Sequence, residues 1–190
     1  MALPKLENPT YEVKVPSLGR RVEFRPFLVK EEKILMMAQE SKDEKKILKT
    51  VKDIISACSF NKLNPNECTT SDLEYLFLQL RAKSIGENVT VNIKCSECEN
   101  YEKHKINLEE ITLSQTEDLD NTIEITDAIG IVLKTISMED AERINKKDTE
   151  KAFNQTIIYS IESIYDADNV YPASESSEKE LTDFIDSLSH

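Results

Sequence analysis

Six apolar residues between positions 47 and 58 recur with the spacing of one face of an α-helix. They stand at i, i+1, i+4, i+7, i+8 and i+11, and a helix places these positions on one side. The residues are Ile47, Leu48, Val51, Ile54, Ile55 and Cys58. This stripe is the clearest helical signal in the chain, and it predicts a helix over about Asp43–Phe60.

Alternating segments predict two β-hairpins on either side of the helical region. Apolar and polar residues alternate in Tyr11–Val15 and again in Arg20–Arg25, which flank a turn with Pro and Gly. A similar pair, Val89–Cys95 and Tyr101–Asn107, flanks the tight turn Cys95-Ser-Glu-Cys98. Each pair is expected to form two antiparallel strands.

Two further helices are expected between these hairpins. Helix formers fill Leu28–Ser41, directly after Pro26. Ser71-Asp-Leu-Glu74 matches a capping box and predicts a third helix of about 15 residues. That helix should stop before Gly86, a residue suited to the position after a helix.

The second half is expected to be mixed. Strands are predicted over Thr122–Ile125 and Gly130–Ile136, with a short helix after Ser137. Later helical stripes consist of Phe153, Ile157, Ile161 and Ile164, and of Leu181, Phe184, Ile185 and Leu188. The predicted fold is α+β, with small β-hairpins packed against several α-helices and an acidic helical C-terminal half. We expect regions 1–107 and 108–190, either separate or as one continuous domain.

Negative charge is concentrated in the second half. The net charge is −12, but residues 1–107 contain 18 basic and 16 acidic residues, whereas residues 108–190 contain 6 and 20. Such a charge repels phosphate backbones and anionic membranes. The sequence also has neither a run of about 18 apolar residues nor an apolar leader. We therefore expect a cytoplasmic protein that binds neither nucleic acid nor membrane.

Motifs for catalysis are largely missing from the sequence. Only His104 and His190 are present, and the three glycines are too far apart for a phosphate-binding loop. The carboxylate pairs Asp118/Asp120 and Asp166/Asp168 occur at the frequency expected by chance in so acidic a chain. A small hydrolase or nuclease that uses carboxylates and a divalent metal is the less favoured alternative.

The four cysteines are the one group of residues in the sequence that suggests a specific chemistry, namely metal binding. Cys95-x-x-Cys98 is half of a zinc-knuckle pattern. Cys58 and Cys68 are the favoured third and fourth ligands of this site. The third helix leads the chain away from Cys68, and the strand that follows can bring Cys95 back to the same end over a similar distance. His104 is a poorer fourth ligand. The alternatives are that the cysteines have no shared role, or that the Cys95/Cys98 pair is redox-active. Structural zinc is the only cofactor expected.

Two surfaces are candidates for binding other proteins. Arg20, Arg21 and Arg25 form a basic patch with Lys14 on the first hairpin, which could dock an acidic surface or be solvent-facing strand residues. The terminal stripe Leu181, Phe184, Ile185 and Leu188 is the apolar candidate, and its alternative role is core packing.

Several segments resemble one viral protein family, and they occur in that family's order. They are Tyr11-Glu-Val-Lys-Val-Pro-Ser-Leu-Gly19, Phe24-Arg-Pro-Phe-Leu-Val-Lys-Glu-Glu-Lys33, the segment from Asp72 to Glu87, and Cys95-x-x-Cys98. They resemble the baseplate hub subunit and hub assembly proteins of T-even-type contractile-tailed bacteriophages. A weaker similarity extends through 127–134 and 166–187.

The resemblance implies a non-enzymatic protein of the tail baseplate hub that acts through contacts with other hub or tail proteins. It also implies that the protein is in the host cytoplasm during assembly and in the tail baseplate of the virion afterwards. It supplies no catalytic residues. A transient tail-assembly chaperone, absent from the mature virion, is the main alternative.

Overall fold

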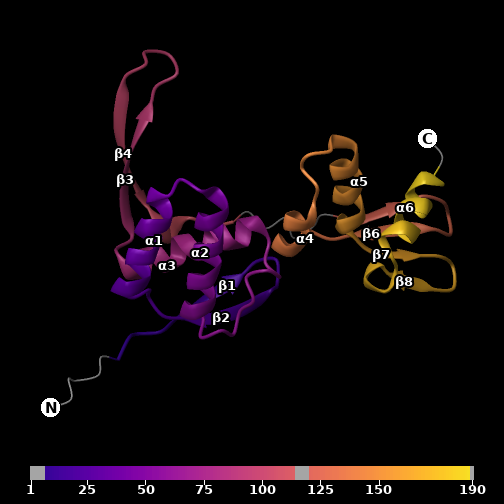
Figure 1. Cartoon of the computed structure of the whole chain (residues 1–190), viewed down its shortest axis with the longest axis horizontal. Coiled ribbons are helices and arrows are strands. Elements are labelled where there is room, and N and C mark those ends of the chain that lie inside the picture. The colour runs from indigo at the N-terminus through magenta and orange to yellow at the C-terminus, as the bar shows by residue number, and fades with distance from the viewer. Residues whose placement is uncertain (1–6, 114–119, 189–190) are drawn as a thin grey trace. The chain divides into compact units, whose positions relative to one another are not determined.

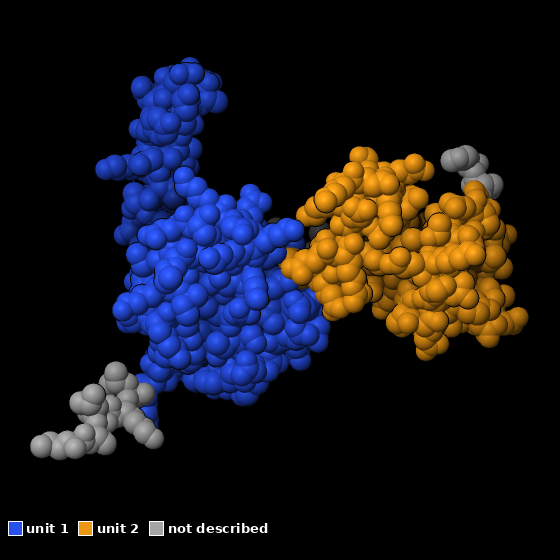
Figure 2. Space-filling view, viewed as in Figure 1, with its two compact units in different colours: residues 1–115 blue, residues 116–190 orange. Residues whose placement is uncertain are grey.

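The chain was analysed as a computed structural model that describes residues 7–113 and 120–188. It divides into two compact units, residues 1–115 and residues 116–190 (Figure 2). Each unit is described by itself. No helix in the described ranges is both long enough and apolar enough to span a membrane.

Unit 1 contains two hairpins and three helices (Figure 1). Its elements are β1 (Tyr11–Val15), β2 (Arg20–Phe24), α1 (Val29–Glu40), α2 (Glu44–Cys58), α3 (Thr70–Ser84), β3 (Asn88–Lys94), β4 (Tyr101–Asn107) and the short 3₁₀-helix η1 (Leu108–Glu110). β1 pairs with β2 and β3 pairs with β4, both antiparallel. The predicted hairpins and helices of this unit are all present.

The core of unit 1 lies between the first hairpin and the helices. The end of the predicted stripe on α2 is buried, at Ile54, Ile55 and Cys58. β1 and β2 contribute Val13 and Val22, which face each other in the register, and α3 adds Leu73, Leu76 and Leu80. The apolar spacing in the sequence therefore identified the packed faces correctly.

Both ends of α3 differ in detail from the prediction. The helix begins at Thr70, with Thr69 as N-cap and Asp72 as its capping-box partner, in place of Ser71 and Glu74. Asp72 is preferred because its carboxylate also binds the β1–β2 turn, as described below. Gly86 follows the C-cap Ile85 as predicted, but its φ of +140° lies outside the left-handed helical region.

Unit 2 is a four-stranded antiparallel sheet with helices. Its strands, β5 (Thr122–Glu124), β6 (Gly130–Leu133), β7 (Ile161–Tyr165) and β8 (Val170–Pro172), pair in sequence order. Its helices are α4 (Met138–Arg143), α5 (Thr149–Ser160) and α6 (Glu178–Asp186), with the 3₁₀-helix η2 (Ala173–Glu175). Helices with small antiparallel sheets confirm the α+β class.

The predicted stripe from Phe153 to Ile164 is not one helix. α5 ends at Ser160, and Ile161 and Ile164 lie in strand β7, where Ile164 pairs with Ile131 of β6. Phe153 is 65% exposed and does not belong to a buried stripe. Spacing alone misassigned the segment because β-branched residues at i and i+3 fit either a helix or a strand that finds partners elsewhere in the chain.

Candidate functional site

The β3–β4 hairpin, residues 88–107, projects from the helices of unit 1 (Figure 1), and we call it the arm. Its seven cross-strand pairs run from Asn88↔Asn107 at the base to Lys94↔Tyr101 near the tip. From Asn92 to Lys105 every residue is exposed. Because a lone two-stranded hairpin is only marginally stable in water, an arm of this kind is suited to contact another surface.

The two faces of the arm differ in character. One face has the half-buried Val89 and Val91 followed by Ile93, which is 50% exposed. The opposite face is polar near the base and ends at Tyr101, which is 71% exposed. Its cations are Lys94, Lys103 and Lys105. The arm thus offers exposed apolar side chains on both faces, together with charges.

The base of the arm is anchored to α3. Leu108 is buried, and its N–H donates to the Glu87 carbonyl at 2.7 Å. Lys83 of α3 forms an ion pair with Glu109, and this hydrogen bond raises the pKa of Lys83. The arm therefore starts from a fixed position on the unit.

The tip of the arm is a closed turn around the cysteine pair. Cys95 N–H donates to the Asn100 carbonyl at 2.8 Å, and Glu99 N–H donates to the Cys95 carbonyl at 3.1 Å. Glu99 has a φ of +59°, which turns the chain back into β4. The neighbouring N–H groups of Cys98 and Glu97 and the Cys98 thiol lower the pKa of Cys95. Both cysteines are exposed.

Cys58 and Cys68, the expected completing pair, lie in the body of unit 1. Both are fully buried, and burial raises the pKa of each thiol to about 11. The distance argument for a four-cysteine site required β3 to return along α3, whereas the arm leads away from the helices (Figure 1). The structure therefore does not bring the four cysteines together.

The basic patch on the first hairpin is largely neutralised by neighbouring carboxylates. Arg20 pairs with Glu67 at 3.8 Å, and Arg21 pairs with Glu12 at 3.6 Å. Arg25 is only 15% exposed and pairs inside the unit with Glu31. Arg25 thus holds an ion pair within the unit and presents little of its side chain to solvent.

The terminal stripe faces the interior of unit 2. Leu181 is buried, and Phe184, Ile185 and Leu188 are half-buried. α6 packs against α5, so the apolar side of α6 has a partner within the unit. Of the two roles considered for this stripe, the structure favours core packing.

The other residues considered for catalysis contact neighbouring residues in their own segment, where the structure describes them. Asp166 closes a turn by accepting from the N–H groups of Asp168 and Asn169 and from the Tyr171 hydroxyl. The Asp168 N–H contributes most to a lowered pKa of Asp166. Asp118 of the other pair lies outside the described residues. His104 lies on β4, with Nε2 3.6 Å from a Glu102 oxygen.

A cavity of about 310 Å³ lies between α5 and α6 of unit 2. Residues that line it include Lys151, Asn154, Gln155, Ile158 and Glu178. Across the ranges 7–113 and 120–188, no group of three or more His, Cys, Asp or Glu side chains is arranged to hold a metal ion.

Sequence reasoning missed the exposed residues of the arm. The signal for them was present in β4, where Tyr101-Glu-Lys-His-Lys has no apolar alternation beyond its first residue. A strand that lacks a buried face must pair without packing on a core. Such a strand indicates an element that projects into solvent.

The fold and the arm define a small two-unit α+β protein with a projecting hairpin. A family model described as T4 bacteriophage base plate protein matches residues 8–190. The chain therefore belongs to this family, which confirms the resemblance found in the sequence at the level of a T4-type phage baseplate protein. No curated protein and no solved structure matches the chain.

Proposed function

We propose that the chain is a non-enzymatic structural or assembly protein of the tail baseplate hub, which acts through contacts with other phage hub or tail proteins. It would assemble in the host cytoplasm and act at the tail baseplate. Membership of the baseplate family supports the setting. The observation that carries the contact role is the arm, whose outer residues from Asn92 to Lys105 are all exposed.

The energetics of the arm favour docking. Ile93 and Tyr101 keep half or more of their surface in water in the folded unit, and burial in an interface would contribute about 25 cal/mol for each Å² of apolar surface removed from water. The three arm lysines can pair with acidic groups at the rim of such an interface. An arm fixed at Leu108 and free at its tip can reach a neighbouring subunit.

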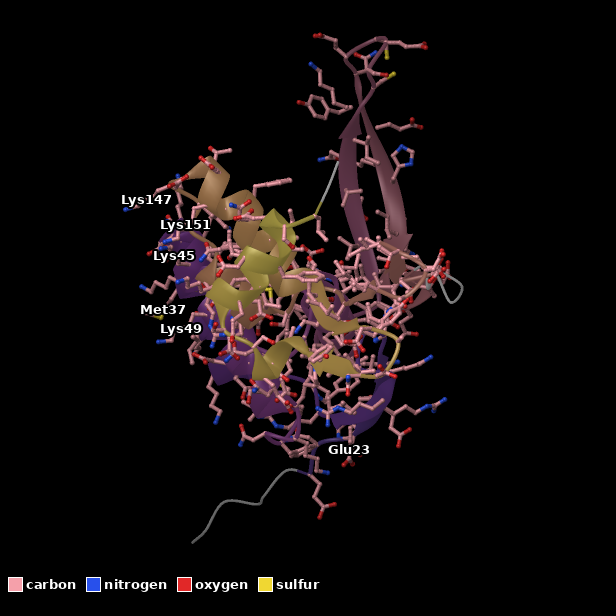
Figure 3. The ribbon with its side chains drawn as sticks, turned by 90° about the vertical axis from the view of Figure 1, so that its right-hand side faces the viewer. Glu23, Met37, Lys45, Lys49, Lys147 and Lys151 are labelled. Carbon is pink, nitrogen blue, oxygen red and sulfur yellow. The ribbon has the colours of Figure 1, made fainter. Side chains whose placement is uncertain are left out.

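Helix α1 supplies a second surface suited to protein contact. Val29, Met36 and Met37 are 67%, 57% and 68% exposed on its outer side. Met37 projects from the helices on the same side as Lys45 and Lys49 of α2 (Figure 3). Methionine is enriched at protein interfaces and adapts to irregular partners.

The arm can be tested by complementation of a phage that lacks the gene. Ile93→Thr together with Tyr101→Thr should change the melting temperature little, because half or more of each side chain is exposed and threonine suits a strand, but should reduce the number of complete baseplates seen by electron microscopy. Lys147→Ser, a change at an exposed lysine of unit 2 (Figure 3), is the control and should complement fully. Normal baseplate numbers with the double variant would contradict the proposal.

A transient assembly chaperone would use the same contacts and leave before the virion is complete. Quantitative mass spectrometry of purified virions and of baseplate intermediates separates the two roles. A structural subunit is present in both samples at the same ratio to a known baseplate protein. A chaperone is present only in the intermediates.

A further inference from the structure

We propose that the tip of the arm binds zinc through Cys95 and Cys98, and that a second copy of the chain completes the site with the same two residues. The site would link two chains tip to tip. This inference does not depend on the proposed function, because it concerns the purified chain alone.

The tip already has the form of a chelating half-site. Two residues separate the cysteines. The turn is closed by hydrogen bonds from the Cys95 N–H to the Asn100 carbonyl and from the Glu99 N–H to the Cys95 carbonyl, and it holds both exposed cysteines at the tip. Two thiolates at this spacing can bind one ion.

Among the described residues, no third side chain is arranged to join the two cysteines around one ion. Cys58 and Cys68 are buried in the body of the unit, and His104 lies three strand positions below Tyr101, about 10 Å along β4. No cluster of three potential ligands occurs among the residues that the structure describes. Structural zinc is nearly always four-coordinate, so two ligands must come from another molecule.

A second tip fits this requirement best. It supplies two more thiolates of the same kind, and a shared ion on a twofold axis gives a closed dimer in which both chains make identical contacts. The exposure of every residue from Cys95 to Asn100 leaves the tip accessible. Glu97 and Glu99 would repel their counterparts, so the tips should associate only with the metal present.

The binding step involves no redox change. Four thiols each lose a proton, the four sulfurs bind one Zn²⁺, and four protons go to solvent. The product carries a net charge of −2 at the metal centre. Competing disulfides are prevented by a reductant that does not bind zinc.

The experiment is a zinc titration of the full-length chain under that reductant, followed by sedimentation velocity and metal analysis. The 21.7 kDa chain should double in mass at one zinc per two chains, and excess chelator should reverse the change. Cobalt(II) in place of zinc should give the absorption bands of a tetrahedral thiolate site. Magnesium should have no effect.

Cys95→Ser and Cys98→Ser should each abolish both the mass change and the cobalt spectrum while the melting temperature of the metal-free chain stays the same. Ser96→Ala, between the two cysteines, is the matched control and should behave as wild type. Three outcomes would overturn the proposal. They are no zinc binding, one zinc per chain without a change in mass, and a dimer that survives the chelator.

Discussion

Arg25 and Glu31 form a two-pronged ion pair inside unit 1. Arg25 Nη1 donates to Glu31 Oε2 at 2.9 Å, and Nη2 donates to Oε1 at 2.8 Å. Glu31 Oε2 also accepts from the Leu28 N–H at 2.7 Å, at the start of α1. The pair therefore connects the end of β2 to the first turn of α1, with both side chains at most 15% exposed.

Removing one partner of this pair should destabilise unit 1 strongly. Arg25→Ala leaves the Glu31 carboxylate buried without its counter-charge, which should lower the free energy of unfolding by about 3 kcal/mol. Arg21→Ala is the matched control, because the Arg21–Glu12 pair is 76% and 65% exposed and should change stability by about 0.5 kcal/mol at most. Urea denaturation of the three proteins checks this. Equal effects of the two changes would show that the buried pair is no stronger than the exposed one.

The same pair predicts a pH dependence. Hydrogen bonds from Arg25 hold the pKa of Glu31 below its usual value. The contribution of this ionised carboxylate is thus complete above the unfolded pKa of about 4.3 and is lost as pH falls through the lower folded pKa. The stability difference between wild type and Glu31→Gln should be largest near neutral pH and should shrink below about pH 4.3. A difference that stays constant down to acidic pH would contradict this assignment.

Asp72 joins the β1–β2 turn to the start of α3. Its buried carboxylate accepts from the N–H and hydroxyl of Ser17 and from the N–H and hydroxyl of Thr69. Asp72→Ala removes all four of these hydrogen bonds and the capping box of α3, and should cost about 3 kcal/mol. Asp43→Ala, at the exposed N-cap of α2, should cost about 1 kcal/mol. Thermal melting of both variants tests the ranking, and the opposite order would refute it.

Gly86 tests the backbone conformation after α3. At a φ of +140°, a β-branched residue is strained, although no atom lies within 4 Å of the place where a Cβ would be. Gly86→Val should therefore cost about 1–3 kcal/mol through the backbone alone. An unchanged denaturation midpoint would mean that the chain leaves α3 in another conformation.

Local patterns predicted the elements of unit 1 well. The stripe ending in Cys58 found α2, and alternation found both hairpins, because each signal depends on residues close in sequence. The segment after Ser160 was misassigned because Ile164 becomes a strand residue only through its pairing with Ile131, which is 33 positions away.

Predicting the candidate sites required long-range geometry even more than predicting the helices and strands did. The sequence shows Arg25 as one of several basic residues, but its role follows from the path between β2 and α1 that brings Glu31 to it. Similarly, the spacing of Cys95 and Cys98 was visible, whereas the direction of the arm is set by the anchoring of Leu108 at its base. The tip was therefore found from sequence, but its separation from Cys58 and Cys68 was not.

The central claim is that the arm contacts other baseplate proteins, and lysine acylation of purified baseplate intermediates tests it most directly. The rates at Lys94, Lys103 and Lys105 would be compared with those in the free chain at the same zinc concentration, with exposed Lys147 as the internal reference. The account predicts that the arm lysines react several-fold more slowly in the intermediates while Lys147 is unchanged. Equal rates at the arm lysines in both samples would contradict it.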